Sequence, residues 1–158
     1  MISIKNSQRR IKVNVHQLEA DAQLLLTILG YKDFDLGIWI TTNKTIRYYN
    51  KTYRHKDKPT DILSFPFHPE LQPGHKIKIR SEDDKNLGDV IISAEYVVNF
   101  LKKSDNSVST ISDKALNDRF RVLLVHGICH LLGYDHITDE QFSQMQRKEK
   151  FLLKQLAN

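Results

Sequence analysis

The segment HGICHLLGYDH, residues 126–136, places the strongest constraint on the fold, because it requires a helix that ends in a sharp turn. His126 and His130 are four residues apart, a spacing that puts two side chains on one face of a helix, one turn apart. Gly133 suits the left-handed backbone conformation that ends a helix and reverses the chain. His136 is then expected to return over the same face, so that three imidazoles meet.

Three imidazoles on one face predict a bound metal ion. His126, His130 and His136 favour a single zinc ion, which imidazole nitrogens bind at roughly 2.0–2.1 Å, although nickel, copper or iron would also accept them. Three protein ligands leave the fourth tetrahedral position open, which is typical of a catalytic site. Two alternatives remain: a fourth protein ligand from elsewhere, which would make the zinc structural, or hydrogen-bonded histidines with no metal.

The ligand spacing matches the zinc-protease pattern HExxHxxGxxH but lacks its glutamate. In that pattern the residue after the first histidine is the general base, whereas here it is Gly127, which has no proton acceptor. Peptide hydrolysis would need a carboxylate from elsewhere, such as Glu95 or Asp135. The sequence therefore predicts a metal-dependent hydrolase and leaves its general base open.

A basic segment precedes a predicted strand and is a candidate substrate-binding region. Arg54, Lys56 and Lys58 stand just before Pro59. The arginine fork suits a phosphate group, and the net charge of +5 attracts polyanions. The alternative is a solvated loop that leads into a core strand. We take Arg54 as a candidate catalytic and substrate-binding residue and Lys56 as a second substrate-binding residue.

Hydrophobic patterning predicts interspersed strands and helices, and hence one α/β domain over residues 1–158 with a small mixed sheet. We expect strands at Ile2–Ile4, Leu36–Thr41, Asp61–Phe67 and Asp89–Ser93, with a weaker candidate at Lys76–Arg80 inside a loop over 68–87. We expect helices at Val13–Leu29, Asn43 to about Tyr53, Ala94–Lys103, Lys114–Leu132 and Asp139–Leu156, with a polar surface connection at Ser104–Asp113. Gly30 is expected to end the first of these helices and Asn43 to cap the second. Pro66 cannot donate to a sheet ladder and therefore indicates an edge strand.

The sequence indicates a cytoplasmic protein with no membrane partner. The N-terminus lacks the apolar core of a signal peptide, and apolar runs such as Leu24–Leu29 are too short to cross a bilayer. Cys129 is the single cysteine, so an intramolecular disulfide framework is excluded. It points about 100° away from the neighbouring histidine around the helix and is expected to be a core residue.

Three segments resemble a known family. HGICHLLGYDH is similar to the HGxLHLxGYDH signature of the YbeY-type ribosomal RNA maturation factors, which are bacterial single-strand-specific endoribonucleases. NKTYRHKDKPTDILSFPF at Asn50–Phe67 and LGDVIIS at Leu87–Ser93 resemble the same family, in matching order and spacing. Together these segments span more than half of the chain. The chain departs at Cys129, where the family usually has leucine, and both residues are apolar.

The resemblance implies a small α/β domain with a sheet of about four strands and a zinc site on a long helix and the turn after it. His126, His130 and His136 would bind zinc, and Arg54 would match the functional arginine that the family is proposed to use on RNA. The implied role is 16S rRNA 3′-end maturation and ribosome quality control, with single-stranded RNA and the small ribosomal subunit as partners.

The resulting hypothesis is metal-assisted phosphodiester cleavage. Zinc would polarise the scissile phosphate or supply hydroxide, and Arg54 would stabilise the added negative charge. Whether water or the RNA 2′-hydroxyl attacks stays open. Two rival hypotheses remain: a zinc metallopeptidase with a relocated base, and a non-catalytic ribosome-assembly factor that contains structural zinc.

Overall fold

One mixed sheet of four strands forms the centre of the computed structural model, which describes residues 1–105 and 110–158. Its strands lie in the order β1-β2-β4-β3, with bounds Ile2–Asn6 (β1), Asp35–Thr41 (β2), Asn86–Ser93 (β4) and Ile62–Pro66 (β3). β2 pairs in parallel with β1 and with β4, whereas β3 is antiparallel to β4. The predicted mixed sheet is confirmed, and Pro66 lies on an edge strand as expected.

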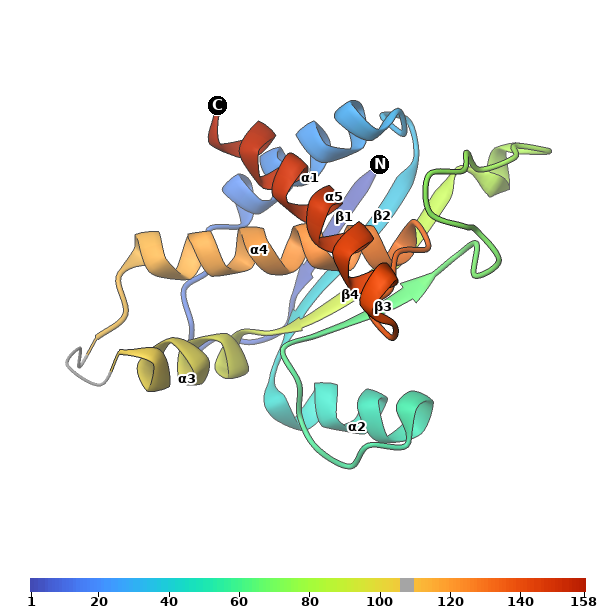
Figure 1. The fold of residues 1–158 in the computed structure, drawn as a ribbon. Coiled ribbons are helices and arrows are strands. Elements are labelled where there is room, and N and C mark those ends of the chain that lie inside the picture. Colours follow the sequence, from blue (N-terminus) through green and yellow to red (C-terminus); the bar gives the residue numbers. More distant parts are fainter. Residues whose placement is uncertain (106–109) are drawn as a thin grey trace.

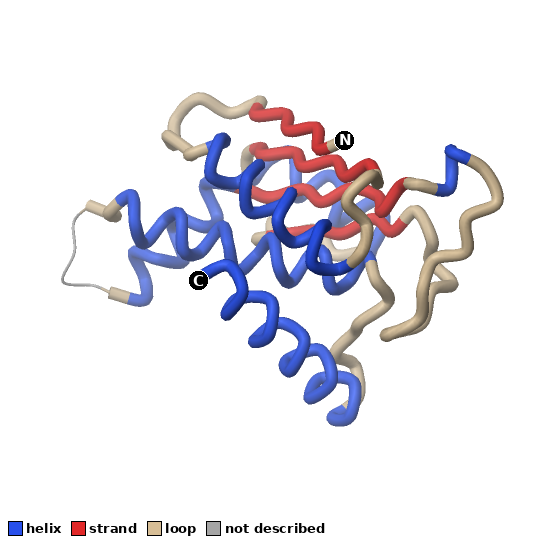
Figure 2. The backbone as a smooth tube through the Cα atoms, turned by 90° about the horizontal axis from the view of Figure 1, so that it is seen from above, coloured by secondary structure: helices blue, strands red, loops and turns tan. Residues whose placement is uncertain are grey.

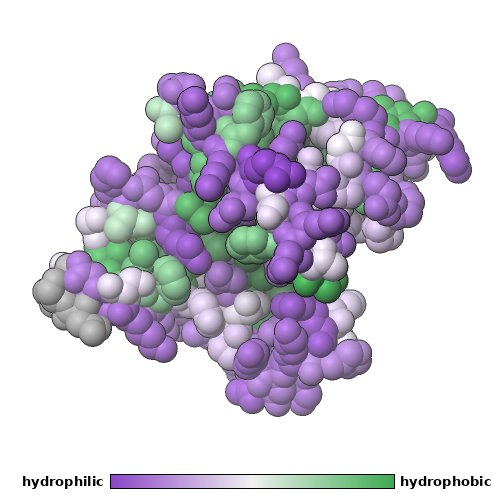
Figure 3. All heavy atoms as spheres, viewed as in Figure 1, coloured by the Kyte–Doolittle hydropathy of each residue, from purple (hydrophilic) through white to green (hydrophobic). Residues whose placement is uncertain are grey.

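Helices cover the two faces of the sheet unequally (Figures 1 and 2). The helices are α1 (Val15–Leu29), α2 (Asn43–Arg54), α3 (Ala94–Ser104), α4 (Asp113–Leu131) and α5 (Asp139–Ala157), with a short 3-10 helix at Glu82–Asp84. α1, α4 and α5 lie over one face, and α2 lies over the other (Figure 1). Figure 3 shows that mostly hydrophilic residues cover the surface in view, with hydrophobic ones between the helices.

Alternation along β2 explains these two layers. Leu36, Ile38 and Ile40 point into the main core, where they join buried residues of α1, α3, α4 and α5. Trp39 points to the other face, beside a smaller cluster of Ile46, Leu63 and Ile91 beneath α2. Because successive strand residues face opposite sides, β2 separates the two layers. The short α2 covers only part of its face.

Capping residues fix where several helices begin and end. Gly30 has φ 85° and ends α1 as predicted, and the Ser112 hydroxyl accepts the Ala115 N–H at the start of α4. The expectation that Asn43 caps α2 is wrong by one residue. Thr42 is the cap, and its hydroxyl accepts the Thr45 N–H.

The weaker strand candidate at Lys76–Arg80 is wrong, because this stretch is irregular. The Ile77 N–H donates to the Tyr31 hydroxyl at 3.3 Å instead of to a neighbouring strand. β4 begins at Asn86, earlier than expected, because Asn86 pairs with Asp35 of β2. Residues 106–109 of the predicted surface connection lie outside the described residues. Within the described ranges, no helix is both long and apolar enough to cross a membrane.

Candidate metal centre

α4 carries His126 and His130 on its last turns, close against the sheet. The helix packs on β3 and β4, and the Ser64 hydroxyl of β3 donates to the Gly127 carbonyl at 3.4 Å. A glycine at this position lets the helix backbone approach the strands. The two histidines therefore belong to a helix segment that packs directly on the sheet.

The turn after α4 brings the third histidine back to the first two. The helix ends at Leu131, and Gly133 takes φ 93°, the left-handed conformation expected for this residue. The Tyr134 N–H donates to the Cys129 carbonyl at 3.0 Å, which closes the turn. His136 follows two residues later, and its ring lies 5.0 Å from that of His130 between centroids.

The three imidazoles form a cluster that can hold one metal ion. One ligand nitrogen from each of His126, His130 and His136 lies within 4.8 Å of the others. The two Nε2 atoms of His126 and His130 are 3.1 Å apart. Tetrahedral zinc with bonds of roughly 2.0–2.1 Å separates two ligand atoms by about 3.3 Å, so this pair already has nearly the required spacing. His136 is exposed, which leaves the cluster accessible on one side.

Two acceptors orient the half-buried rings. Nδ1 of His130 donates to the Tyr134 carbonyl at 2.9 Å, because a carbonyl oxygen can only accept. Nδ1 of His126 lies 2.9 Å from the Glu149 carboxylate of α5, which accepts its proton in the same way. With the protons on Nδ1, both Nε2 lone pairs are available, as in metal-bound histidines whose second nitrogen is held by an acceptor.

Burial disfavours the charged form of His130. Desolvation lowers the pKa of His130, and the nearby His126 and His136 lower it further. The neutral ring is the form that binds a metal. Cys129 is fully buried in the main core, as expected, and burial raises the pKa of its thiol to about 12.

The basic candidates lie on the opposite face of the sheet from α4. Arg54 is the last residue of α2 and is exposed, and its Nη1 lies 3.5 Å from Oδ1 of Asn50. Lys56 is also exposed, and its backbone N–H donates to the Asn50 carbonyl at 3.3 Å. Among the described residues, no hydrogen bond or ion pair joins Arg54 or Lys56 to the histidines. The structure thus brings together the three predicted metal ligands, whereas the two predicted RNA-binding residues lie apart from them.

The two carboxylates considered as relocated bases have other partners. Glu95 accepts the Asn43 N–H at 2.8 Å and so helps to start α2. Asp135 accepts the His136 N–H at 2.8 Å within the turn. The sequence does not single out Glu149. A metal-binding histidine predicts an acceptor for its second nitrogen, but no pattern indicates which of the 19 acidic residues supplies it.

Fold and cluster together define a small α/β protein with a three-histidine centre suited to a metal ion. A family model described as Endoribonuclease YbeY matches residues 3–157, and the chain belongs to this family. The expectation of an enzyme of the endoribonuclease class, a hydrolase acting on RNA, is confirmed by this membership.

Relatives match the chain over nearly all of its length. An Endoribonuclease YbeY from Homo sapiens is 39% identical over 154 residues, which cover 98% of this chain and 87% of the relative. Another from Aquifex aeolicus is 36% identical over 165 residues, covering 99% and 98%. The solution structure of TM1509 from Thermotoga maritima matches with a TM-score of 0.58 and 21% identity, over 99% of this chain and 89% of that one. The last likeness supports the α/β fold alone.

Proposed function

We propose that this protein is a zinc-dependent endoribonuclease that cleaves single-stranded RNA. The observation that carries the proposal is the pair of Nε2 atoms of His126 and His130, 3.1 Å apart and oriented by acceptors behind them. Relatives named as endoribonucleases support RNA as the substrate. Maturation of the 16S rRNA 3′ end on the small ribosomal subunit, in the cytoplasm, is the role that we infer.

His126, His130 and His136 would hold one zinc ion, and their neighbours would keep them in place. When bound, zinc supplies Lewis acidity toward the scissile phosphodiester. Glu149 and the Tyr134 carbonyl hold the Nδ1 protons of His126 and His130, so that neither ring has to reorient on binding the ion.

Arg54 and Lys56 would bind the phosphate backbone of the RNA. Both side chains are exposed. In the described part of the chain, the guanidinium of Arg54 has one weak hydrogen bond, to Asn50 at 3.5 Å, which a phosphate could replace. A guanidinium near the scissile phosphate stabilises the negative charge that develops there. Because α2 and α4 flank β3 from opposite faces of the sheet, an RNA strand that passes over this edge strand can contact both helices.

The test compares His126→Ala with His16→Ala, which removes an exposed histidine on α1. We expect His126→Ala to lose bound zinc, measured by elemental analysis, together with cleavage of a labelled single-stranded RNA. His16→Ala should keep both. Unchanged cleavage by zinc-free His126→Ala would refute the proposal. Cleavage of a peptide substrate but not of RNA by the unmodified protein would favour the metallopeptidase alternative.

A further inference from the structure

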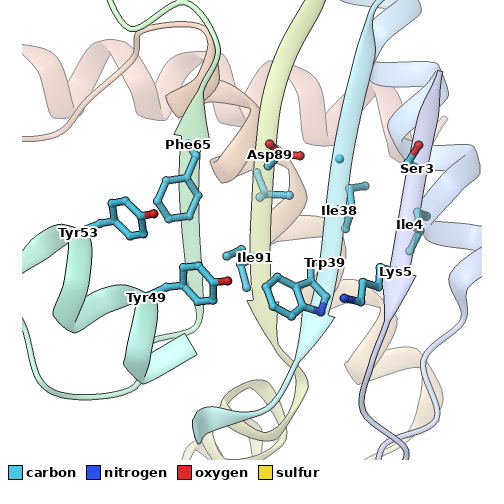
Figure 4. A pocket seen from close by; sticks show the side chains of 12 residues that line it. Ser3, Ile4, Lys5, Ile38, Trp39, Tyr49, Tyr53, Phe65, Asp89 and Ile91 are labelled. Atoms are coloured by element: carbon cyan, nitrogen blue, oxygen red, sulfur yellow. The ribbon is translucent and has the colours of Figure 1, made fainter. Parts of the chain in front are cut away.

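A groove of about 520 Å³ lies on the sheet face that α2 covers only in part, away from the histidine cluster (Figure 4). Side chains from all four strands and from α2 line it, among them Lys5, Trp39, Tyr49, Tyr53, Phe65 and Asp89. The strand pairing places Lys5 beside Trp39 and Gly37 beside Asp89. Gly37 has no side chain, and the Asp89 carboxylate occupies the space that a Cβ on Gly37 would take.

Aromatic rings form the walls of this groove. Tyr49 and Tyr53 are stacked with their planes 5° apart and their centroids 6.0 Å apart. Trp39 meets Tyr49 edge to face at 5.6 Å, and Phe65 meets Tyr53 in the same way at 5.3 Å. The rings of Tyr49 and Tyr53 point from α2 toward the strands (Figure 4). Tyr53 is still 61% exposed, so part of its surface remains available to a ligand.

Two charged groups accompany the rings, and they have opposite signs. Nζ of Lys5 lies 4.7 Å from the centre of the Trp39 ring. The carboxylate of Asp89 is exposed and has no hydrogen-bond or ion-pair partner in the described part of the chain. A carboxylate can accept from the exocyclic amine of cytosine, and an ammonium can bind a phosphate.

Aromatic faces, an unpaired acceptor and a cation together match a nucleotide better than they match an apolar peptide. Bases stack on aromatic side chains exposed on a sheet, which is a common way to bind single-stranded RNA. A purely apolar occupant would bury the Asp89 carboxylate without a partner, at a cost in free energy. The volume of the groove lies within the range of small-molecule sites.

The edge strand β3 connects the groove to the histidine cluster. Phe65 faces the groove, whereas the preceding Ser64 faces α4 and contacts the Gly127 carbonyl next to His126. The two sites therefore lie on opposite sides of one strand at the edge of the sheet. One RNA chain that passes over this edge can contact both sites.

We propose that the groove binds a nucleotide of the single-stranded RNA substrate, by stacking its base on Tyr53 and placing an edge of the base against Trp39. Asp89 accepts from the amine of the base, which favours cytosine over uracil, and Lys5 contacts the phosphate. RNA as the ligand rests on the proposed function, whereas the groove and its chemistry do not depend on the histidines.

The experiment uses Trp39, the only tryptophan of the chain, as the reporter. The full-length protein is titrated in EDTA with short oligocytidylate or oligouridylate, and tryptophan fluorescence gives the affinity. We expect saturable quenching, with tighter binding of oligocytidylate. Tyr53→Ala should weaken binding by about tenfold, and Asp89→Ala should remove the preference for cytosine. Phe142→Ala, which removes a ring on α5 that is 53% exposed, should change neither property.

Unchanged Trp39 emission at saturating RNA, or equal affinities for Tyr53→Ala and Phe142→Ala, would overturn the proposal. A second outcome would also overturn the proposal: Trp39 emission that changes with protein concentration in the absence of RNA, together with a dimer in analytical sedimentation. This result would mean that a second copy of the chain occupies the groove. Gel analysis of the same samples separates the two proposals, because RNA cleavage in EDTA would contradict the metal-dependent function and leave the binding result intact.

Discussion

Gly127 packs so closely against Ile62 that a Cβ on this glycine would lie 2.8 Å from the Cδ1 atom of Ile62. The same Cβ would lie 2.9 Å from Cγ1 of Val90. The position directly after His126 therefore faces the sheet and has no room for a side chain. In the zinc-protease pattern this position carries the general base, so the packing of α4 argues against a peptidase of that kind.

Gly127→Glu is expected to destabilise the protein and not to give it peptidase activity. The new side chain would have to displace Val90 and Ile62 and would place a carboxylate in the core, at a cost of at least about 3 kcal/mol. Urea denaturation followed by circular dichroism measures this loss. Ser143→Glu on the exposed face of α5 is the control, and it should stay within about 0.5 kcal/mol of the original protein. Peptidase activity in a stable Gly127→Glu protein would contradict this account.

Glu149→Gln is expected to lower zinc affinity by about 10- to 100-fold, which is typical for loss of an acceptor behind a metal-binding histidine. The amide keeps the size of the side chain but removes the charge that holds the Nδ1 proton of His126. Competition with a chromophoric chelator gives the affinity. Glu140→Gln makes the same chemical change at an exposed position on the same helix. Equal zinc affinities for the two variants would show that Glu149 does not position His126.

Local rules predict the histidine cluster well, because its members are close in sequence. The four-residue spacing of His126 and His130, and the φ 93° turn at Gly133, both follow from helix geometry. Glu149 is 23 residues from its partner and comes from another helix. Its contact depends on how α5 packs on α4, which the sequence pattern does not encode.

Contacts between distant segments also explain why the strand expected at Lys76–Arg80 does not form and why the sequence does not predict the groove. Ile77 and Ile79 alternate with basic residues in the sequence, as in a strand, but only Ile77 is buried and Ile79 is 52% exposed. Alternation predicts burial but supplies no neighbouring strand, and the Ile77 N–H bonds to a tyrosine hydroxyl instead. The groove likewise depends on strand order, because Trp39 and Phe65 share one face only after β4 is inserted between β2 and β3.

Arg54→Ala is expected to weaken RNA binding and to make it less sensitive to salt. Each phosphate contact releases counterions, so losing one should reduce the slope of log K against log salt by about 0.7 for single-stranded RNA. Fluorescence anisotropy at several salt concentrations, in EDTA, gives this slope. Arg80→Ala, which removes an exposed arginine in the loop before β4, is the control. A slope that is the same in both variants would remove Arg54 from the set of phosphate contacts.

Gly133→Ala is expected to destabilise the fold and to lower zinc affinity, because this glycine has two reasons to lack a side chain. Its φ of 93° is strained for alanine, and a Cβ would overlap the Leu71 carbonyl oxygen of the loop packed against the turn. Gly74→Ala is the matched control, since Gly74 has φ 80° but no atom within 4 Å of the added Cβ. The first substitution should cost at least about 1 kcal/mol more than the second. It should also reduce zinc binding, because His136 follows this turn. Denaturation and chelator competition measure the two effects, and equal losses in both variants would mean that backbone strain alone accounts for the result.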